Sequence, residues 1–247
     1  MKIKAPESIS FAETSFCPGC GHGIAARLIG EVMEEMGLTE KLLTVVDVAC
    51  ASLNIDTWRF DTIMAAHGRP IATATGVKKI RKENPVLAYL GDGAAYSIGI
   101  SETIYGAIRN DNVVVIVINN GVFGMTGGQM APTSLEGQKT TSSLKGRNVS
   151  KAGKPFDIVK TIGNLDIAYL ARGSVANAVD IRKTKKYIRK AFEKHMNNEG
   201  YCLIEILSPC PTNVNLGMTP EKCADRIDTV VSEYYKTGEY VDKGGNI

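Results

Sequence analysis

Val86-Leu-Ala-Tyr-Leu-Gly-Asp-Gly93 decides the fold of this chain, together with Val113-Val-Val-Ile-Val-Ile-Asn-Asn120 further along. Each stretch is a short apolar run that ends in glycine or polar residues, and a helical pattern over residues 97–108 separates the two. Continuously apolar strands that alternate with helices are typical of a parallel sheet covered on both faces. The sequence therefore predicts an α/β fold with such a sheet.

The same alternation extends to both sides of this pair. Further helices and strands are predicted at residues 24–36, 42–46, 72–82, 177–195 and 202–207. Gly37 follows the first of these helices directly and is expected to end it. Residues 119–154 are rich in Gly, Thr and Ser and show little periodicity. A loop of this length in a compact domain is usually functional or mobile.

Composition and charge exclude several classes of protein. The chain has 247 residues, 44% of them hydrophobic and 22% charged, with a net charge of +3. We expect one domain over residues 1–247, with an irregular Cys-x2-Cys segment near its start and a peripheral tail at about 217–247. The balanced charge does not favour nucleic-acid binding, and the basic run at residues 182–190 has the spacing of a solvated helix face. With no long apolar run and no secretory pattern, a cytoplasmic protein without a membrane span is expected.

Asp92 and Asn120 come at the ends of two neighbouring predicted strands, where parallel α/β sheets bind ligands. With the main-chain carbonyl of Val122 they offer three oxygen ligands suited to Mg²⁺, and the other positions are left to water and diphosphate oxygens. Gly91 and Gly93 let the backbone approach phosphates closely, and the following helix N-terminus favours their charge. The pairing resembles the diphosphate-binding motif of thiamine diphosphate enzymes. The alternative is an ordinary loop in which Asp92 caps the helix.

The six cysteines allow more than one interpretation. Cys17-Pro-Gly-Cys20 has the spacing of a zinc half-site, a dithiol redox pair or part of an iron–sulfur site. Cys50 and Cys210 lie in irregular segments just after apolar strands, and four thiolates at one edge would hold a [4Fe–4S] cluster. The alternative is a minor zinc site with lone structural cysteines. Cys202 is expected in the core and Cys223 on a partly buried helix.

Seven ordered stretches resemble the β subunit of 2-oxoacid:ferredoxin oxidoreductases. They are Cys17-Pro-Gly-Cys-Gly-His22, Cys50-Ala-Ser52, His67-Gly-Arg-Pro70 with Ala74-Thr-Gly76, Gly91-Asp-Gly93, Asn119-Asn120, Gly124-Met-Thr-Gly-Gly-Gln129 with Ala131-Pro-Thr133, and Ser208-Pro-Cys210-Pro-Thr212. The chain departs from the usual pattern at Val48-Ala49, where the family is glycine-rich, and at Ala94, where it often has an acidic residue. The resemblance implies a thiamine diphosphate-binding fold of the diphosphate-domain type.

The resemblance also implies a set of cofactor contacts. A [4Fe–4S] cluster would be ligated by Cys17, Cys20, Cys50 and Cys210. Mg²⁺ would be bound by Asp92, Asn120 and the Val122 carbonyl, beside Gly91 and Gly93. The diphosphate would lie along Gly124, Met125 and Thr126. The thiazolium would lie near Cys20, His22, Cys50, Ala51, Ser52 and His67.

The implied activity is oxidative decarboxylation of a 2-oxoacid, with the acyl group passed to coenzyme A and the electrons passed through the cluster to ferredoxin. A partner α subunit with a pyrimidine-binding domain would supply the activating glutamate, and ferredoxin-like γ and δ subunits are expected as well. His67 is the candidate catalytic residue, because a histidine beside the cofactor could donate to the substrate carbonyl; it could equally hold its loop. His22 has the same two interpretations. His195, near the end of a basic helix, is expected to be favoured there by the helix dipole.

The residues that follow Cys50 give the indication of the substrate. Ala51, Ser52 and Leu53 offer no cation for a second carboxylate, which favours a branched-chain 2-oxoacid such as 2-oxoisovalerate over 2-oxoglutarate. The alternative substrates are 2-oxoglutarate and pyruvate. Two other functions compete with this one. A non-redox thiamine diphosphate lyase component would leave the cysteines unexplained, and a zinc-stabilised binding module would make Gly-Asp-Gly incidental.

Overall fold

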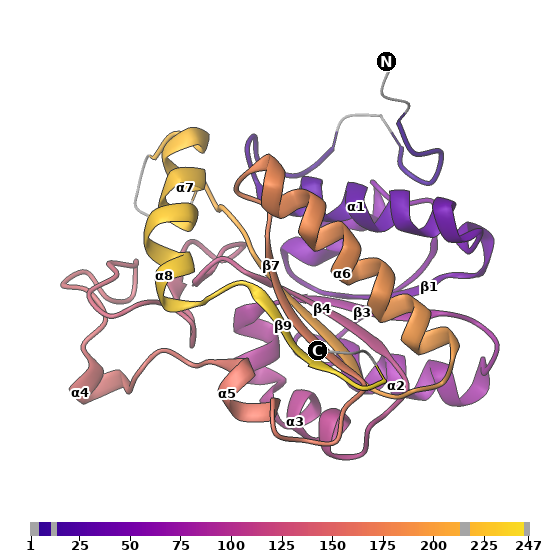
Figure 1. Ribbon diagram of the computed structural model, residues 1–247. Coiled ribbons are helices and arrows are strands. Elements are labelled where there is room, and N and C mark those ends of the chain that lie inside the picture. Colours follow the sequence, from indigo (N-terminus) through magenta and orange to yellow (C-terminus); the bar gives the residue numbers. More distant parts are fainter. Residues whose placement is uncertain (1–4, 11–13, 213–217, 245–247) are drawn as a thin grey trace.

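The centre of the molecule is a twisted sheet of mostly parallel strands between two layers of helices (Figure 1). The computed structural model describes residues 5–10, 14–212 and 218–244. Across the sheet the order is β2 (Asp61–Ala65), β1 (Leu43–Asp47), β3 (Val86–Gly91), β4 (Val114–Asn119), β8 (Cys202–Leu207), β7 (Tyr169–Ser174) and β9 (Gly238–Asp242). All neighbours pair in parallel except β7 and β9. The predicted α/β fold with a parallel sheet is thus confirmed.

The helices divide between the two faces of the sheet. Their bounds are α1 (Gly21–Met36), α2 (Pro70–Ile80), α3 (Ile100–Ile108), α4 (Val149–Ala152), α5 (Ile158–Ile162), α6 (Ala178–Met196), α7 (Pro220–Arg226) and α8 (Ser232–Tyr234). Short 3₁₀ segments are η1 (Thr39–Lys41) and η2 (Cys50–Ile55), and π-helical turns are η3 (Ala94–Ile98) and η4 (Ile227–Val231). Figure 1 shows α1 and α6 on one face, with α2, α3 and α5 on the other.

Each face of the sheet has its own apolar core, because side chains along a strand alternate between the two faces. Tyr89 and Ile116 point into the core that α1 and α6 cover. Ala88 and Val115 point into the core on the side of α2, α3 and α5. This explains why β3 and β4 are apolar up to their last residues, Gly91 and Asn119, and why their sequence predicted the sheet. None of the helices in the described ranges is long and apolar enough to cross a membrane.

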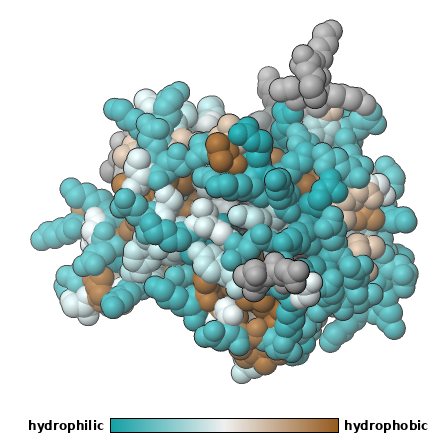
Figure 2. Space-filling view, viewed as in Figure 1, coloured by the Kyte–Doolittle hydropathy of each residue, from teal (hydrophilic) through white to brown (hydrophobic). Residues whose placement is uncertain are grey.

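The basic face of α6 is largely paired with acidic side chains. Lys185 Nζ lies 2.7 Å from carboxylate oxygens of both Glu31 and Glu35 on α1. Lys190 Nζ lies 2.6 Å from Glu239 and 2.9 Å from Asp242 on β9. Figure 2, viewed as in Figure 1, shows a mostly hydrophilic surface. These pairs tie α6 to its neighbours, and the basic run is a solvated helix face.

His195 is not the dipole-stabilised cation expected from the sequence. It is fully buried, its Nε2 accepts a hydrogen bond from Val86 N–H at 3.0 Å, and its Nδ1 lies 3.0 Å from Asn112 Oδ1. Burial lowers its pKa to about 3. The prediction is therefore wrong in its charge: a neutral imidazole links the end of α6 to the start of β3.

The C-terminal tail is expected at the periphery over about 217–247, and its described residues 218–244 supply one edge of the sheet. Its strand β9 pairs antiparallel with β7. Tyr235 is buried, and its hydroxyl lies 3.0 Å from the Thr133 carbonyl and 2.9 Å from the Phe156 carbonyl. Among the cysteines given structural positions, Cys202 is buried in β8, and Cys223 is buried on α7.

Candidate active site

One cavity of ≈240 Å³ opens at the carboxyl ends of β1, β3 and β4. These strands end at Asp47, Gly91 and Asn119, so the residues that follow them meet at this edge of the sheet. The lining residues are His22, Asp47, Val48, Ala49, Cys50, Ala51, His67, Gly91, Asp92, Gly93, Ala94, Asn120, Val122, Phe123, Gly124, Met125 and Thr126. Of the thiamine diphosphate and Mg²⁺ contacts expected from the sequence, Cys20 and Ser52 do not line it, and of the expected cluster ligands only Cys50 does.

Asp92 is a buried carboxylate in the wall of this cavity. Its Oδ2 accepts hydrogen bonds from Gly121 N–H at 3.0 Å and from the Thr133 hydroxyl. Burial nevertheless raises its pKa to about 7. No ion pair to Asp92 forms within the part of the chain that the structure describes. Because a buried charge normally pairs or coordinates a metal, this environment fits a divalent cation.

The turn after β4 presents the other oxygen donors of the predicted Mg²⁺ site. Asn120 Oδ1 accepts from Val122 N–H at 3.1 Å, and Gly121 between them has φ +72°. Val122 then begins the short antiparallel pair of β5 (Val122–Phe123) and β6 (Gln129–Met130). Asn120 and Val122 line the same cavity as Asp92. Their oxygens are of the kind that Mg²⁺ prefers.

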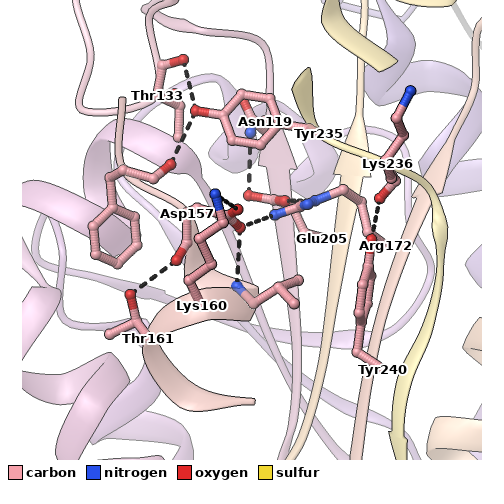
Figure 3. A network of polar contacts seen from close by, with 12 residues as sticks. Asn119, Thr133, Asp157, Lys160, Thr161, Arg172, Glu205, Tyr235, Lys236 and Tyr240 are labelled. Atoms are coloured by element: carbon pink, nitrogen blue, oxygen red, sulfur yellow. Dashed lines mark hydrogen bonds and ion pairs between the residues drawn. The ribbon is translucent and has the colours of Figure 1, made fainter. Parts of the chain in front are cut away.

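A buried charge network holds the end of β4 in place (Figure 3). Asn119 Nδ2 donates to Glu205 Oε1 at 3.1 Å, and the other oxygen of Glu205 accepts from Arg172 Nε. A terminal nitrogen of Arg172 lies 2.7 Å from Asp157 Oδ1. Glu205 and Arg172 are paired across β8 and β7. Asn119, which precedes the proposed metal ligand Asn120, is thus held by Glu205 on β8 and, through Glu205, by Arg172 on β7.

Arg147 organises the long loop at 119–154, for which the sequence left function and mobility open. Its guanidinium donates to the carbonyl oxygens of Ala131, Pro132, Ser134, Ala152, Gly153 and Lys154. Tyr235 reaches the same loop through the Thr133 carbonyl (Figure 3). The loop therefore presents the Thr133 hydroxyl to Asp92. Sequence reasoning missed Arg147, because a lone arginine among Gly, Ser and Lys residues carries no pattern.

Cys50 and Cys210 both lie close to Gly124. A Cβ atom at Gly124 would lie 3.6 Å from the Sγ atoms of both cysteines. Burial first, and then the neighbouring Cys210, Cys50 and Cys17, raise the pKa of the Cys20 thiol to about 12. The four predicted cluster cysteines are thus neighbours, and none of them forms a disulfide. In the described residues, however, no three His, Cys, Asp or Glu side chains are arranged to hold a metal ion.

The ionisation and the number of these thiols bear on whether they could bind an iron–sulfur cluster. Buried thiols whose charges oppose one another resist ionisation, and a bound metal cluster would stabilise their thiolate forms. Four cysteine thiols are also the donor set of a [4Fe–4S] cluster. The donors therefore fit in kind and number.

His67 lies in the turn between β2 and α2 and pairs with Asp47 at the end of β1. Its Nδ1 is 2.6 Å from Asp47 Oδ2, while Asp47 Oδ1 accepts from Gly68 N–H at 2.7 Å. Gly68 has φ +75°, and a Cβ there would come within 2.8 Å of Gly99 N. Sequence reasoning missed Asp47, because its partner lies far along the chain and no motif spans the two.

His22 is set deeper than His67. It is only 2% exposed, its Nδ1 lies 2.9 Å from the Tyr89 hydroxyl, and its ring stacks on Phe16 at a centroid distance of 5.4 Å. Burial lowers its pKa to about 4, so it is neutral at physiological pH. This position suits a residue that shapes the wall of the cavity.

Known proteins match this chain in both sequence and structure. Residues 45–206 match the family described as "Thiamine pyrophosphate enzyme, C-terminal TPP binding domain". The 2-oxoglutarate synthase subunit KorB of Methanocaldococcus jannaschii is 35% identical over 214 residues, which cover 86% of this chain and 75% of that protein. The chain belongs to the thiamine pyrophosphate-binding subunits of the 2-oxoacid:ferredoxin oxidoreductase family.

Two further members of this family bear on the interpretation. The ketoisovalerate oxidoreductase subunit VorA of Methanothermobacter thermautotrophicus is 40% identical over 202 residues, or 81% of this chain. The chain spans 42% of that relative's length. A solved 2-oxoglutarate:ferredoxin oxidoreductase from Magnetococcus marinus, with 2-oxoglutarate, coenzyme A and succinyl-CoA bound, matches with a TM-score of 0.79. That match covers 100% of this chain and 87% of the other at 22% identity, and it shows the shared fold.

Proposed function

We propose that this chain catalyses, with partner subunits, the oxidative decarboxylation of a 2-oxoacid to an acyl-coenzyme A, with electrons passed through a [4Fe–4S] cluster to ferredoxin. One observation carries the proposal: Gly124 lies in the wall of the cavity that holds Asp92 and Asn120, and a Cβ atom at Gly124 would lie 3.6 Å from the sulfur atoms of both Cys50 and Cys210. A non-redox thiamine enzyme would not explain the thiols at that position, and a zinc-binding module would not explain the cavity.

The residues of this chain would bind and orient the two cofactors. Asp92, Asn120 and the Val122 carbonyl would hold Mg²⁺ against the diphosphate, and Gly124, Met125 and Thr126 would follow the diphosphate. Cys17, Cys20, Cys50 and Cys210 would hold the cluster next to them. When bound, thiamine diphosphate supplies the carbanion that adds to the 2-oxo carbon and accepts the electrons left by loss of CO₂.

The activating glutamate is proposed to come from a partner α subunit. Thiamine diphosphate needs a carboxylate against its aminopyrimidine ring. In the described part of the chain, the carboxylates that line the cavity are those of Asp47 and Asp92. Asp47 already accepts from Gly68 and faces His67, and Asp92 already accepts from Gly121 and Thr133. Neither is placed for a second partner of this kind.

A branched-chain 2-oxoacid such as 2-oxoisovalerate is the proposed substrate. The cavity wall includes Val48, Ala49, Ala51, Phe123 and Met125, and neither lysine nor arginine is among its described lining residues. A second carboxylate, as in 2-oxoglutarate, would therefore lack a cation on this side of the site. The likeness to the ketoisovalerate oxidoreductase subunit supports the same choice.

The first experiment measures iron, acid-labile sulfide, zinc and thiamine diphosphate in the complex co-purified anaerobically with its partners. About four irons and four sulfides attributable to this chain are expected, lost in Cys17→Ser or Cys210→Ser. The matched control is Cys202→Ala, which removes a thiol from the core of β8. Thiamine diphosphate without iron would favour a non-redox lyase, and zinc alone would contradict both enzyme functions.

The second experiment compares 2-oxoacids in the assembled complex by coenzyme A-dependent reduction of ferredoxin or a viologen dye. We expect 2-oxoisovalerate to give a kcat/KM at least about tenfold above that of 2-oxoglutarate, since a missing counter-charge is worth one or more kcal/mol. A higher value for 2-oxoglutarate would overturn the substrate assignment and leave the cofactor assignment intact.

A further inference from the structure

Asp47 and His67 form a pair at the cavity that the cofactor motifs do not account for. Asp47 is the last residue of β1, and its carboxylate is fully buried. Each of its two oxygens has one partner, Oδ1 the Gly68 N–H and Oδ2 the Nδ1 atom of His67. A buried carboxylate that accepts from a ring nitrogen fixes the proton on that nitrogen. Nδ1 of His67 is therefore protonated.

The loop that carries His67 is fixed on its other side as well. Arg69 donates to the Ile98 carbonyl at 2.8 Å and pairs with Glu102 at 2.9 Å. Gly68 packs so closely on Gly99 that no side chain fits between them. With the backbone held from two sides and Nδ1 held by Asp47, the imidazole has one orientation. Such preorganisation is what a group that transfers protons requires.

Nε2 is the ring nitrogen that remains for a ligand. The His67 side chain is 33% exposed and lines the cavity with Asp92 and Asn120. Among the residues that the structure describes, no hydrogen-bond partner of Nε2 is found. His22, the other lining histidine, is 2% exposed and neutral, and its Nδ1 is engaged with Tyr89. His67 is thus the lining histidine that can reach a molecule in the cavity.

We propose that Asp47 is a positioning residue that holds His67 with Nδ1 protonated, so that Nε2 exchanges a proton with the carbonyl oxygen of the 2-oxoacid. The inference rests on the proposed function. When a nucleophile bonds to the 2-oxo carbon, the π electrons of its C=O bond move to oxygen, which takes the Nε2 proton of the doubly protonated ring and leaves the neutral ring protonated on Nδ1. When that carbonyl re-forms in the acyl product, the hydroxyl proton returns to Nε2. His67 therefore ends the cycle as it began, and no other proton donor is required.

Asp47→Asn tests the pair because an amide has only one acceptor oxygen. If that oxygen serves the Gly68 N–H, the amide nitrogen faces His67 and forces Nδ1 to become an acceptor. In the neutral ring the proton then lies on Nε2, which can no longer accept the returning hydroxyl proton. The chain contains three histidines, so ¹⁵N-histidine NMR of the full chain, with His67→Gln for assignment, reads the tautomer directly. At a pH where the ring is neutral, we expect Nδ1–H in the wild type and Nε2–H in the variant.

Kinetics of the assembled complex give the second readout. Asp47→Asn and His67→Gln should each lower kcat by about 10²-fold or more, while the KM for the 2-oxoacid and the affinity for thiamine diphosphate change little. Because Asp47 acts through His67, the double variant should lose no more than His67→Gln alone. Asp111→Asn is the control: this carboxylate pairs with Arg109 before β4, at the opposite edge of the sheet, and its loss should leave kcat unchanged.

The outcomes separate the inference from the proposed function. A complex that binds thiamine diphosphate and oxidises 2-oxoacids, but whose kcat is unaffected by His67→Gln, would overturn the inference alone. An Asp47→Asn loss that persists undiminished in the His67→Gln background would show a structural role and overturn it too. A wild-type complex without thiamine diphosphate or 2-oxoacid oxidation would overturn both. If Asp47→Asn does not fold, the wild-type tautomer and His67→Gln still decide the question.

Discussion

Asp92 is a carboxylate that the fold buries without a counter-charge. Its contribution to the stability of the folded chain should therefore decrease as the pH rises, which is the opposite of the usual behaviour of a paired carboxylate. Its pKa in the folded chain is about 7, above the ordinary value of 3.8. Between these values the folded, metal-free chain keeps a proton that the unfolded chain releases. Asp92 therefore favours the folded state below about pH 4, and this contribution is lost as the pH rises to about 7.

Asp92→Asn should consequently stabilise the metal-free chain at about pH 8, by about 1.4 kcal/mol for each unit by which the pKa of Asp92 is raised. Near pH 4 the same variant should change the free energy of unfolding little. Urea denaturation in the presence of a chelator measures this difference. The same variant should lose Mg²⁺-dependent binding of thiamine diphosphate, because a neutral amide is a poorer ligand for Mg²⁺. An equal difference in stability at both pH values would contradict the buried, uncompensated carboxylate.

His195 should respond to pH in the opposite direction. Its folded pKa of about 3 lies below the ordinary 6.5, so its stabilisation is complete above about pH 6.5 and is lost as the pH falls towards 3. His195→Gln should flatten the acid limb of the stability curve and cost about 1–3 kcal/mol at neutral pH through the Val86 N–H bond. Acid titration followed by circular dichroism checks this. An unchanged acid limb would show that His195 is not buried in its neutral form.

At the scale of elements, the loop around Arg147 connects local packing to cofactor binding. Arg147→Lys replaces a planar fork with a point charge that cannot serve six carbonyl oxygens. We expect new protease cleavage within residues 131–154 and about tenfold weaker binding of thiamine diphosphate, because Thr133 would no longer be held against Asp92. Lys151→Gln, an exposed change in the same loop, is the control. If protease protection and the affinity for thiamine diphosphate were both unchanged, the contacts of Arg147 would not contribute to cofactor binding.

The burial of a strand determines how well it can be predicted from the sequence. The central strands β3 and β4 are apolar on both faces and stand out at once, whereas β2 was not predicted. Ile63 and Met64 on β2 are 44% and 55% exposed, so neither alternation nor a continuous apolar run marks this edge strand. Asp92 and Asn120 were found because each directly follows a buried strand. Asp47 and Arg147 were missed because their partners are brought to them only by the tertiary fold.

At the scale of the whole molecule, the chain offers half of a reaction centre. The cavity lies at one edge of the sheet, and its two aspartates are already committed to the chain's own groups. The purified chain should therefore oxidise no 2-oxoacid, and activity should appear when it is co-expressed with a partner that carries a pyrimidine-binding domain. Coenzyme A-dependent dye reduction by the chain alone, at a rate comparable to that of the complex, would contradict the need for a partner.

Gly124 has a consequence for how such a protein can change over time. Its missing side chain leaves room beside two sulfur atoms and the Asn120 amide, at 3.6, 3.6 and 3.7 Å from where a Cβ would stand. Any side chain there would place its Cβ in van der Waals contact with both thiols and with the Asn120 amide. Evolution of a larger side chain at this position would therefore alter the surroundings of the proposed cluster site and of the proposed Mg²⁺ site together.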